Sequence, residues 1–183
     1  MRGYVQRLID YNSWANRGLL QFLAALPPGT LDATAAGVYG TIRETLLHQL
    51  SSELNYYHRL ASAPPVETPP RPESPGLAFI QRLADESAAN LAGLVDRLPG
   101  PGRMMETSDG MRAAATIVTQ LFMHGCEHRA HIGTILGANG IEPPDLDSWA
   151  YGIFAGGDDW PPDWGPDRRS GPNSAGLTPG PPG

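Results

Sequence analysis

The sequence predicts an all-α protein, an antiparallel four-helix bundle, followed by a Gly/Pro-rich C-terminal tail. Four long segments carry apolar residues at the three- and four-residue spacing of amphipathic helices. Stretches rich in proline and glycine separate these segments, and no convincing strand pattern lies between them. At 183 residues the chain suits one domain with a single core. We therefore predict a helical domain over residues 1–155 and a tail over residues 156–183.

The first predicted helix covers residues 2–26. It ends at Pro27 and Pro28, because proline cannot continue a helix. Its apolar residues follow a three- and four-residue spacing and form one stripe. The stripe consists of Tyr4, Leu8, Tyr11, Ala15, Leu19, Phe22 and Leu26. This stripe is expected to face the core.

The second predicted helix begins with a capping box and runs to about Leu60. Thr41 takes the N-cap position and Glu44 follows three residues later, a spacing at which each side chain caps the other's backbone N–H. Six prolines between residues 62 and 76 then exclude a helix and indicate a stiff connector. Ser74 followed by Pro75 predicts the N-cap and first turn of a third helix.

The third predicted helix ends near Leu98, where a Pro-Gly-Pro-Gly break follows. Residues 103–111 are expected to be extended or a loop. The fourth predicted helix covers residues 112–136, and Asp145 is expected to cap one or two further helical turns. Half of the residues from Gly156 onward are glycine or proline, which predicts a tail without a core of its own. Its Trp160 and Trp164 leave open that it packs on the bundle or on a second subunit.

Charge and cysteine content exclude several classes of protein. The formal net charge is −6 and all thirteen basic residues are arginines, so the chain lacks the basic footprint of a nucleic-acid-binding protein. The single cysteine, Cys126, cannot form an internal disulfide, which fits a cytoplasmic location. The N-terminal residues are too polar for a signal peptide, and no apolar run is long enough for a membrane span.

Three of the five histidines lie within the stretch HGCEHRAHI, residues 124–132. On a helix, His124 and His128 differ by about 40° around the axis, and His131 lies about 20° to the other side of His124. The three rings therefore share one face, where they would crowd one another without a shared partner. Cys126 is about 200° from His124, which excludes a Cys/His zinc finger. The pattern favours a metal site.

One ion cannot contact all three of these histidines. His124 and His131 lie about 10.5 Å apart along the helix axis, whereas metal–nitrogen bonds are about 2.0–2.1 Å long. An ion can lie between His124 and His128, or between His128 and His131, and needs a third ligand from another helix. His48 is the better candidate because its surroundings on the second helix are small and polar, whereas His58 lies near the solvated end of that helix.

Three stretches resemble the DinB/YfiT-like family of bacterial metal-binding four-helix proteins. They are DYNSWANRGLLQFLAALP (10–27), GTIRETLLHQLSSELNYYHRL (40–60) and HGCEHRAHIGTILGANGIEPPDLD (124–147). The resemblance implies a three-histidine metal site formed by His48, His124 and His128. The family commonly has Gln where this chain has His131. His131 is therefore expected to act catalytically beside the metal as a proton acceptor or donor, with a role as a hydrogen-bond donor or a rival ligand also open.

The resemblance also implies a class of activity. Characterised members of the family include metal-dependent enzymes that transfer a low-molecular-weight thiol to an electrophile, so a small-molecule thiol and an electrophile are the expected partners. The expected cofactor is a divalent ion, zinc or nickel first, with iron or manganese as further candidates. A metal-dependent hydrolase and a non-catalytic metal-binding stress-response protein are the alternatives. The resemblance leaves open a homodimer.

Other residues near the site are expected to be structural. Glu53 and Arg129 match family positions and are expected to pair with each other or with a backbone carbonyl. Cys126 is expected to be a small, inert core residue. Tyr11 and Trp14 are expected in the core by their helical spacing, with a place at the mouth of a pocket as the alternative.

Overall fold

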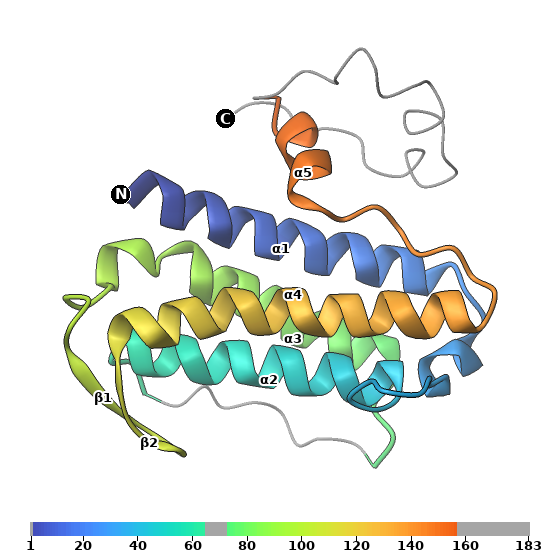
Figure 1. The fold of residues 1–183 in the computed structure, drawn as a ribbon, viewed down its shortest axis with the longest axis horizontal. Helices are drawn as coiled ribbons and strands as arrows, with labels where there is room; N and C mark the ends of the chain where they lie inside the picture. Colours follow the sequence, from blue (N-terminus) through green and yellow to red (C-terminus); the bar gives the residue numbers. More distant parts are fainter. Residues whose placement is uncertain (1, 65–72, 157–183) are drawn as a thin grey trace.

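The computed structural model describes residues 2–64 and 73–156, and these are mostly helical, as expected. Figure 1 shows four long helices side by side and a short helix at the outer face of the first. The helices are α1 (Arg2–Ala24), α2 (Ile42–Leu60), α3 (Leu77–Ala92), α4 (Ala114–Ala138) and α5 (Ser148–Phe154). Two 3₁₀ turns, Pro28–Asp32 and Val95–Arg97, follow α1 and α3. The predicted tail, apart from its first residue, Gly156, lies outside the described residues.

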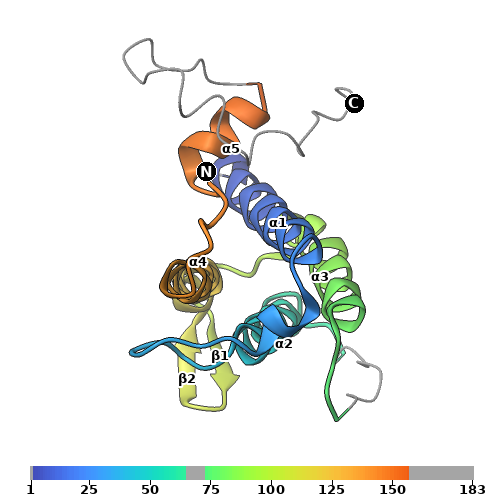
Figure 2. The same cartoon turned by 90° about the vertical axis from the view of Figure 1, so that its right-hand side faces the viewer.

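The four long helices do not alternate in direction along the chain. α2 packs against α3 and α4, and α1 packs against the same two helices from the other side (Figures 1 and 2). α1 and α4 run one way while α2 and α3 run the other way (Figure 1). Arg43 near the start of α2 donates to the Pro75 carbonyl just before α3, so these two helices start side by side. The antiparallel expectation therefore describes the α1–α3 and α2–α4 pairs, whereas α2–α3 and α1–α4 are parallel.

The first residues of α2, α3 and α5 show which of the predicted N-caps are present. The capping box is confirmed: the Thr41 N–H donates to Glu44 Oε2 at 2.8 Å, and the Glu44 N–H donates to Thr41 Oγ1 at 3.2 Å. The prediction of Ser74 as a cap is wrong, because the Gly76 carbonyl accepts the first N–H groups of α3. The prediction of Asp145 is also wrong: Asp147 caps α5 by accepting from the Ala150 N–H at 2.8 Å.

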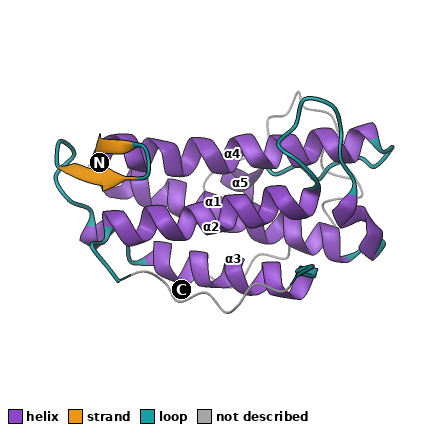
Figure 3. Cartoon of the chain, turned by 90° about the horizontal axis from the view of Figure 1, so that it is seen from below, coloured by secondary structure: helices purple, strands orange, loops and turns teal. Residues whose placement is uncertain are grey.

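A β-hairpin occupies the segment that the sequence left as extended or loop. β1 (Met104–Thr107) pairs antiparallel with β2 (Gly110–Ala113), and Gly110 has a φ of 98°, a conformation that favours glycine. Because Arg112 pairs with Met105 in this sheet, α4 begins at Ala114 and not at residue 112. The hairpin lies at the end of the bundle where α2 finishes and α4 starts (Figure 3). The Arg59 guanidinium donates to the Glu106 carbonyl and links α2 to the hairpin.

The buried arc of α1 is rotated from the predicted stripe. Tyr4 and Leu8 are 80% and 44% exposed, whereas Ile9 and Leu20 are 1% and 4% exposed. The reason is that α1 packs between α3 and α4, so residues on both flanks of the stripe are buried. Trp14 packs under α5, with its ring 5.4 Å from that of Tyr151, as the core assignment expects.

Within residues 2–64 and 73–156, no helix combines the length and apolarity that a membrane crossing requires.

The capping box predicts a measurable loss of stability on substitution. Thr41→Ala removes the hydroxyl that accepts from the Glu44 N–H, and we expect the free energy of unfolding to fall by about 1 kcal/mol. Urea denaturation followed by circular dichroism measures this change. Thr119→Ala is the matched control, because Thr119 is exposed within α4 and donates only to the carbonyl one turn earlier. Equal effects of the two substitutions would contradict a capping role.

Candidate metal centre

Three histidine side chains converge between α2 and α4. His48 comes from the middle of α2, and His124 and His128 come from successive turns of α4. The Nε2 atoms of His48 and His124 are 3.1 Å apart, as are those of His124 and His128. Among the described residues, these are the histidines, cysteines or acids that bring three candidate ligand atoms within 4.8 Å of one another. The sequence-predicted trio is therefore assembled by the packing of α2 on α4.

The geometry of the trio fits a divalent ion. Bonds of about 2.0–2.1 Å to one ion place tetrahedral ligand atoms slightly over 3 Å apart, close to the 3.1 Å that separates His124 Nε2 from the Nε2 atoms of His48 and His128. The Nδ1 atoms of His124 and His128 are buried and have no hydrogen-bond partner. Burying a ring nitrogen that makes no hydrogen bond is unfavourable. A strong partner at Nε2, such as a metal ion, would compensate for this cost. The three residues can thus hold a metal ion.

The surroundings keep two of these rings neutral. Burial, followed by the neighbouring histidines, lowers the pKa of His128 to about 4. Burial and His48 lower the pKa of His124 as well. At neutral pH both rings therefore present a lone pair, the form in which histidine binds metal ions.

Two tyrosines that the sequence analysis did not single out enclose the trio. The Tyr39 ring stacks on His48 at 4.4 Å between centroids and meets the edge of His128 at 5.1 Å. Tyr56 meets His124 edge to face at 5.9 Å. Tyr56 lies about two turns after His48 on the same side of α2, a spacing that could have suggested it. Tyr39 lies in the loop before the capping box, where no periodicity signals a contact.

The other two histidines lie outside the trio. The ring of His131 is 5.6 Å from that of His128, one turn further along α4, and its Nδ1 atom is buried without a hydrogen-bond partner. His58 lines a separate hollow with Arg103 near the end of α2. The structure therefore separates His131 and His58 from the three rings that meet.

Two histidines of the trio open onto a pocket of about 590 Å³. His48 and His124 lie on its wall, as do Ser52, Asn55 and the hairpin turn at residues 107–109. On the other side of His48, a hollow of about 410 Å³ is lined by Tyr39, Glu44 and Ser51. The small polar surroundings expected for His48 are therefore present. A ligand of small-molecule size can reach its ring, since pockets for such ligands commonly measure about 300–1,000 Å³.

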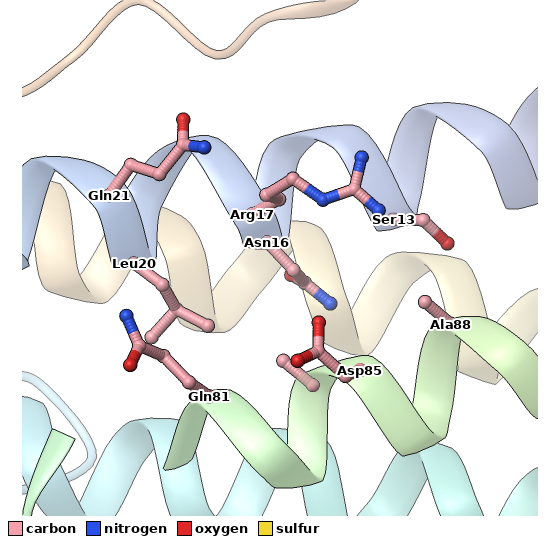
Figure 4. A pocket seen from close by; sticks show the side chains of 9 residues that line it. Ser13, Asn16, Arg17, Leu20, Gln21, Gln81, Asp85 and Ala88 are labelled. Atoms are coloured by element: carbon pink, nitrogen blue, oxygen red, sulfur yellow. The ribbon is translucent and has the colours of Figure 1, made fainter. Parts of the chain in front are cut away.

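A further pocket lies between α1 and α3, away from the histidines. Figure 4 shows Gln21 and Arg17 of α1 facing Gln81 and Asp85 of α3 across it. Its volume is about 230 Å³. None of the five histidines lines it, so we place the candidate site at the trio.

A buried polar network adjoins the trio on the side of α1. The Glu53 carboxylate is 0% exposed and accepts hydrogen bonds from side chains of three helices. Its donors are Asn12, Asn16, Gln49 and Ser87. Arg129 joins the network by donating to Asn12 Oδ1 and Asn16 Oδ1, at 2.8 Å in both cases. Glu53 and Arg129 are thus linked through the two asparagines, and not by the direct pairing that the sequence suggested.

The neighbours of Arg129 correct one expectation and explain a glycine. Cys126 is exposed and not a core residue, because its position on α4 faces away from α2; Arg129 Nη2 donates to its sulfur at 3.5 Å. Gly125 faces the network instead. A Cβ atom at Gly125 would lie 2.8 Å from Asn12 Oδ1 and 3.1 Å from Arg129 Nη1. Only glycine leaves room for these hydrogen bonds.

The close approach at Gly125 predicts opposite outcomes for two substitutions of the same kind in α4. Gly125→Ala forces the network apart, and we expect a loss of about 1–3 kcal/mol in the free energy of unfolding. Gly133→Ala is the control: its Cβ would meet Pro143 at an ordinary 3.8 Å, so the better helix propensity of alanine should leave stability unchanged or raised by up to about 1 kcal/mol. Chemical denaturation measures both. If Gly125→Ala leaves the free energy of unfolding unchanged, the network can rearrange around a side chain at this position, which would contradict the prediction.

Comparison with known proteins identifies the family of the chain. None of the curated proteins matches the chain. The sequence model of the DinB family matches residues 1–156. This match covers most of the chain, including helices α1 to α5 and the three converging histidines, and the chain therefore belongs to the DinB family.

Proposed function

We propose that this protein is a metal-dependent enzyme that transfers a low-molecular-weight thiol to an electrophile. The observation that carries the proposal is the convergence of three imidazole rings, two of which, His48 and His124, line a pocket of about 590 Å³. A site that served only to join two helices would not need access to a pocket of this size.

The proposed ligands of the ion are His48, His124 and His128. Three neutral imidazoles leave positions for a further ligand, which is the pattern of a catalytic site and not of a closed structural one. When bound, a divalent ion in such a site stabilises the deprotonated form of a thiol or a water molecule at neutral pH. Zinc or nickel is the proposed ion, because imidazole ligands suit both.

The chain's own residues supply the remaining requirements. Tyr39 and Tyr56 pack against the three rings and restrict their orientation. The pocket beside His48 and His124 holds the thiol and the electrophile close together, so that the reaction avoids the entropic cost of their encounter. His131 lies on the side of the trio away from this pocket, next to His128. We propose that it tunes the site through His128.

One prediction of the proposed function concerns the ligands. The full chain should bind one divalent ion, and His48→Ala should abolish tight binding because the two histidines of α4 alone give an incomplete site. Elemental analysis after dialysis and a competition titration against a chelator measure stoichiometry and affinity. His58→Ala is the matched control, since His58 is on the same helix and lines another hollow. Full binding by His48→Ala would contradict the assigned trio.

Another prediction concerns His131. His131→Gln should keep one bound ion, because the His131 ring does not take part in the trio, and should lower the rate of thiol transfer by roughly tenfold, as expected for a group that acts through a metal ligand. The measurement pairs metal content with the rate of transfer for the loaded proteins. Loss of the ion would make His131 a ligand in place of one of the trio. An unchanged rate with full metal would contradict its tuning role.

The activity itself is tested with the metal-loaded full chain. Several thiols are assayed against a reactive electrophile, and transfer should depend on the ion and disappear in His48→Ala. Tight metal binding without thiol transfer would support the alternative of a non-catalytic metal-binding protein. Metal-dependent ester hydrolysis without thiol transfer would support a hydrolase.

A further inference from the structure

Two arginines line the same pocket as the histidines, at its other end. Arg59 comes from the last turn of α2 and Arg112 from β2 of the hairpin, whereas His48 and His124 lie near the middle of their helices. Of the residues that line this pocket, Asp109 alone carries a carboxylate. The pocket therefore has imidazoles at one end and guanidinium groups at the other.

The hairpin holds both guanidinium groups. Arg59 donates to the Glu106 carbonyl, and Arg112 Nη1 donates to the Met111 carbonyl at 3.0 Å. Glu106 and Met111 are cross-strand partners, so the two guanidinium groups are anchored at the same position along the hairpin. Within the described part of the chain, neither has a carboxylate partner within 4.0 Å. Both keep further N–H groups, because a guanidinium has five.

This charge arrangement favours an anionic ligand. The chain as a whole carries a formal charge of −6, yet the pocket combines two guanidinium groups with a single carboxylate. Arg59 is half-buried and Arg112 is exposed. Positive charge without a carboxylate partner attracts anions, and the planar guanidinium matches a carboxylate in two parallel hydrogen bonds. The arginines therefore distinguish ligands by charge, while the histidines lie where the reacting atoms would be.

The spacing along α2 indicates the size of such a ligand. His48 and Arg59 are eleven residues apart, roughly 16 Å along the axis, and the long Arg59 side chain shortens the gap that a ligand must bridge. A thiol no larger than cysteine would not extend across this distance. A peptide-sized thiol with a terminal carboxylate would.

We propose that the thiol substrate carries a carboxylate that Arg59 and Arg112 bind, with its sulfur directed toward His48 and His124. This inference rests on the proposed function for the identity of the ligand as a thiol. The recognition of a carboxylate by the two arginines is testable without turnover.

The test compares reduced glutathione with its diethyl ester, which has the same sulfur and no free carboxylate. Arginine Nε–Hε signals of the full chain are followed by NMR at low ionic strength, with and without one equivalent of Zn²⁺. The Arg59 and Arg112 signals should shift to saturation with glutathione and not with the ester, while the signal of Arg103 stays in place. Equal shifts with both compounds, or no shift in either condition, would overturn the inference.

Two variants give a second measurement. Arg112→Gln should weaken glutathione binding roughly tenfold and remove the preference over the ester, because a charge-assisted hydrogen bond is lost. Arg103→Gln is the matched control, an exposed arginine next to the same hairpin that does not line this pocket. A preference that persists in Arg112→Gln would overturn its role, and thermal unfolding verifies that both variants are folded.

These outcomes separate the inference from the proposed function. If the chain binds no metal but the arginine signals respond to glutathione and not to the ester, the carboxylate site stands and the proposed function fails. If thiol transfer occurs at equal rates with glutathione and its ester, the function stands and this inference fails.

Discussion

The burial of the Glu53 carboxylate is the constraint on which the packing of the helices depends. A carboxylate removed from water is costly unless hydrogen-bond donors satisfy its oxygens. Here the donors come from α1, α2 and α3, and Arg129 of α4 is attached to the same group through two asparagines. Sliding any helix by one turn would leave a buried charge without its partners. The network therefore fixes the relative positions of the four long helices.

The same constraint positions the histidines. His48 lies about one and a half turns before Glu53 on α2, and His128 directly precedes Arg129 on α4. Adjacent helical residues differ by about 100° around the axis, so α4 directs Arg129 toward α1 and His128 toward α2. The network holds α2 and α4 in the register at which the three Nε2 atoms meet. Gly125 allows this arrangement, since any side chain there would contact Asn12.

The sequence predicted what depends on local periodicity and short-range caps. The four long helices, the Thr41–Glu44 capping box and the trio of His48, His124 and His128 follow from spacing, reach and the family resemblance, although metal binding by the trio stays a prediction. The hairpin was missed because its four-residue strands are largely exposed and lack an apolar alternation. The contacts of Tyr39 were missed because they arise from tertiary packing. The parallel direction of α2 and α3 was not predicted, because the composition of the connector between them does not indicate at which end of the bundle α3 starts.

The proposed chemistry depends on the joint binding of one divalent ion by His48, His124 and His128. Anomalous diffraction from crystals of the zinc-loaded full chain, recorded on either side of the zinc absorption edge, tests it most directly. We predict one strong peak between α2 and α4, at a bonding distance of about 2.0–2.1 Å from the Nε2 atoms of all three histidines. A peak between His128 and His131 that leaves His48 unbound, or no peak near the trio, would contradict it.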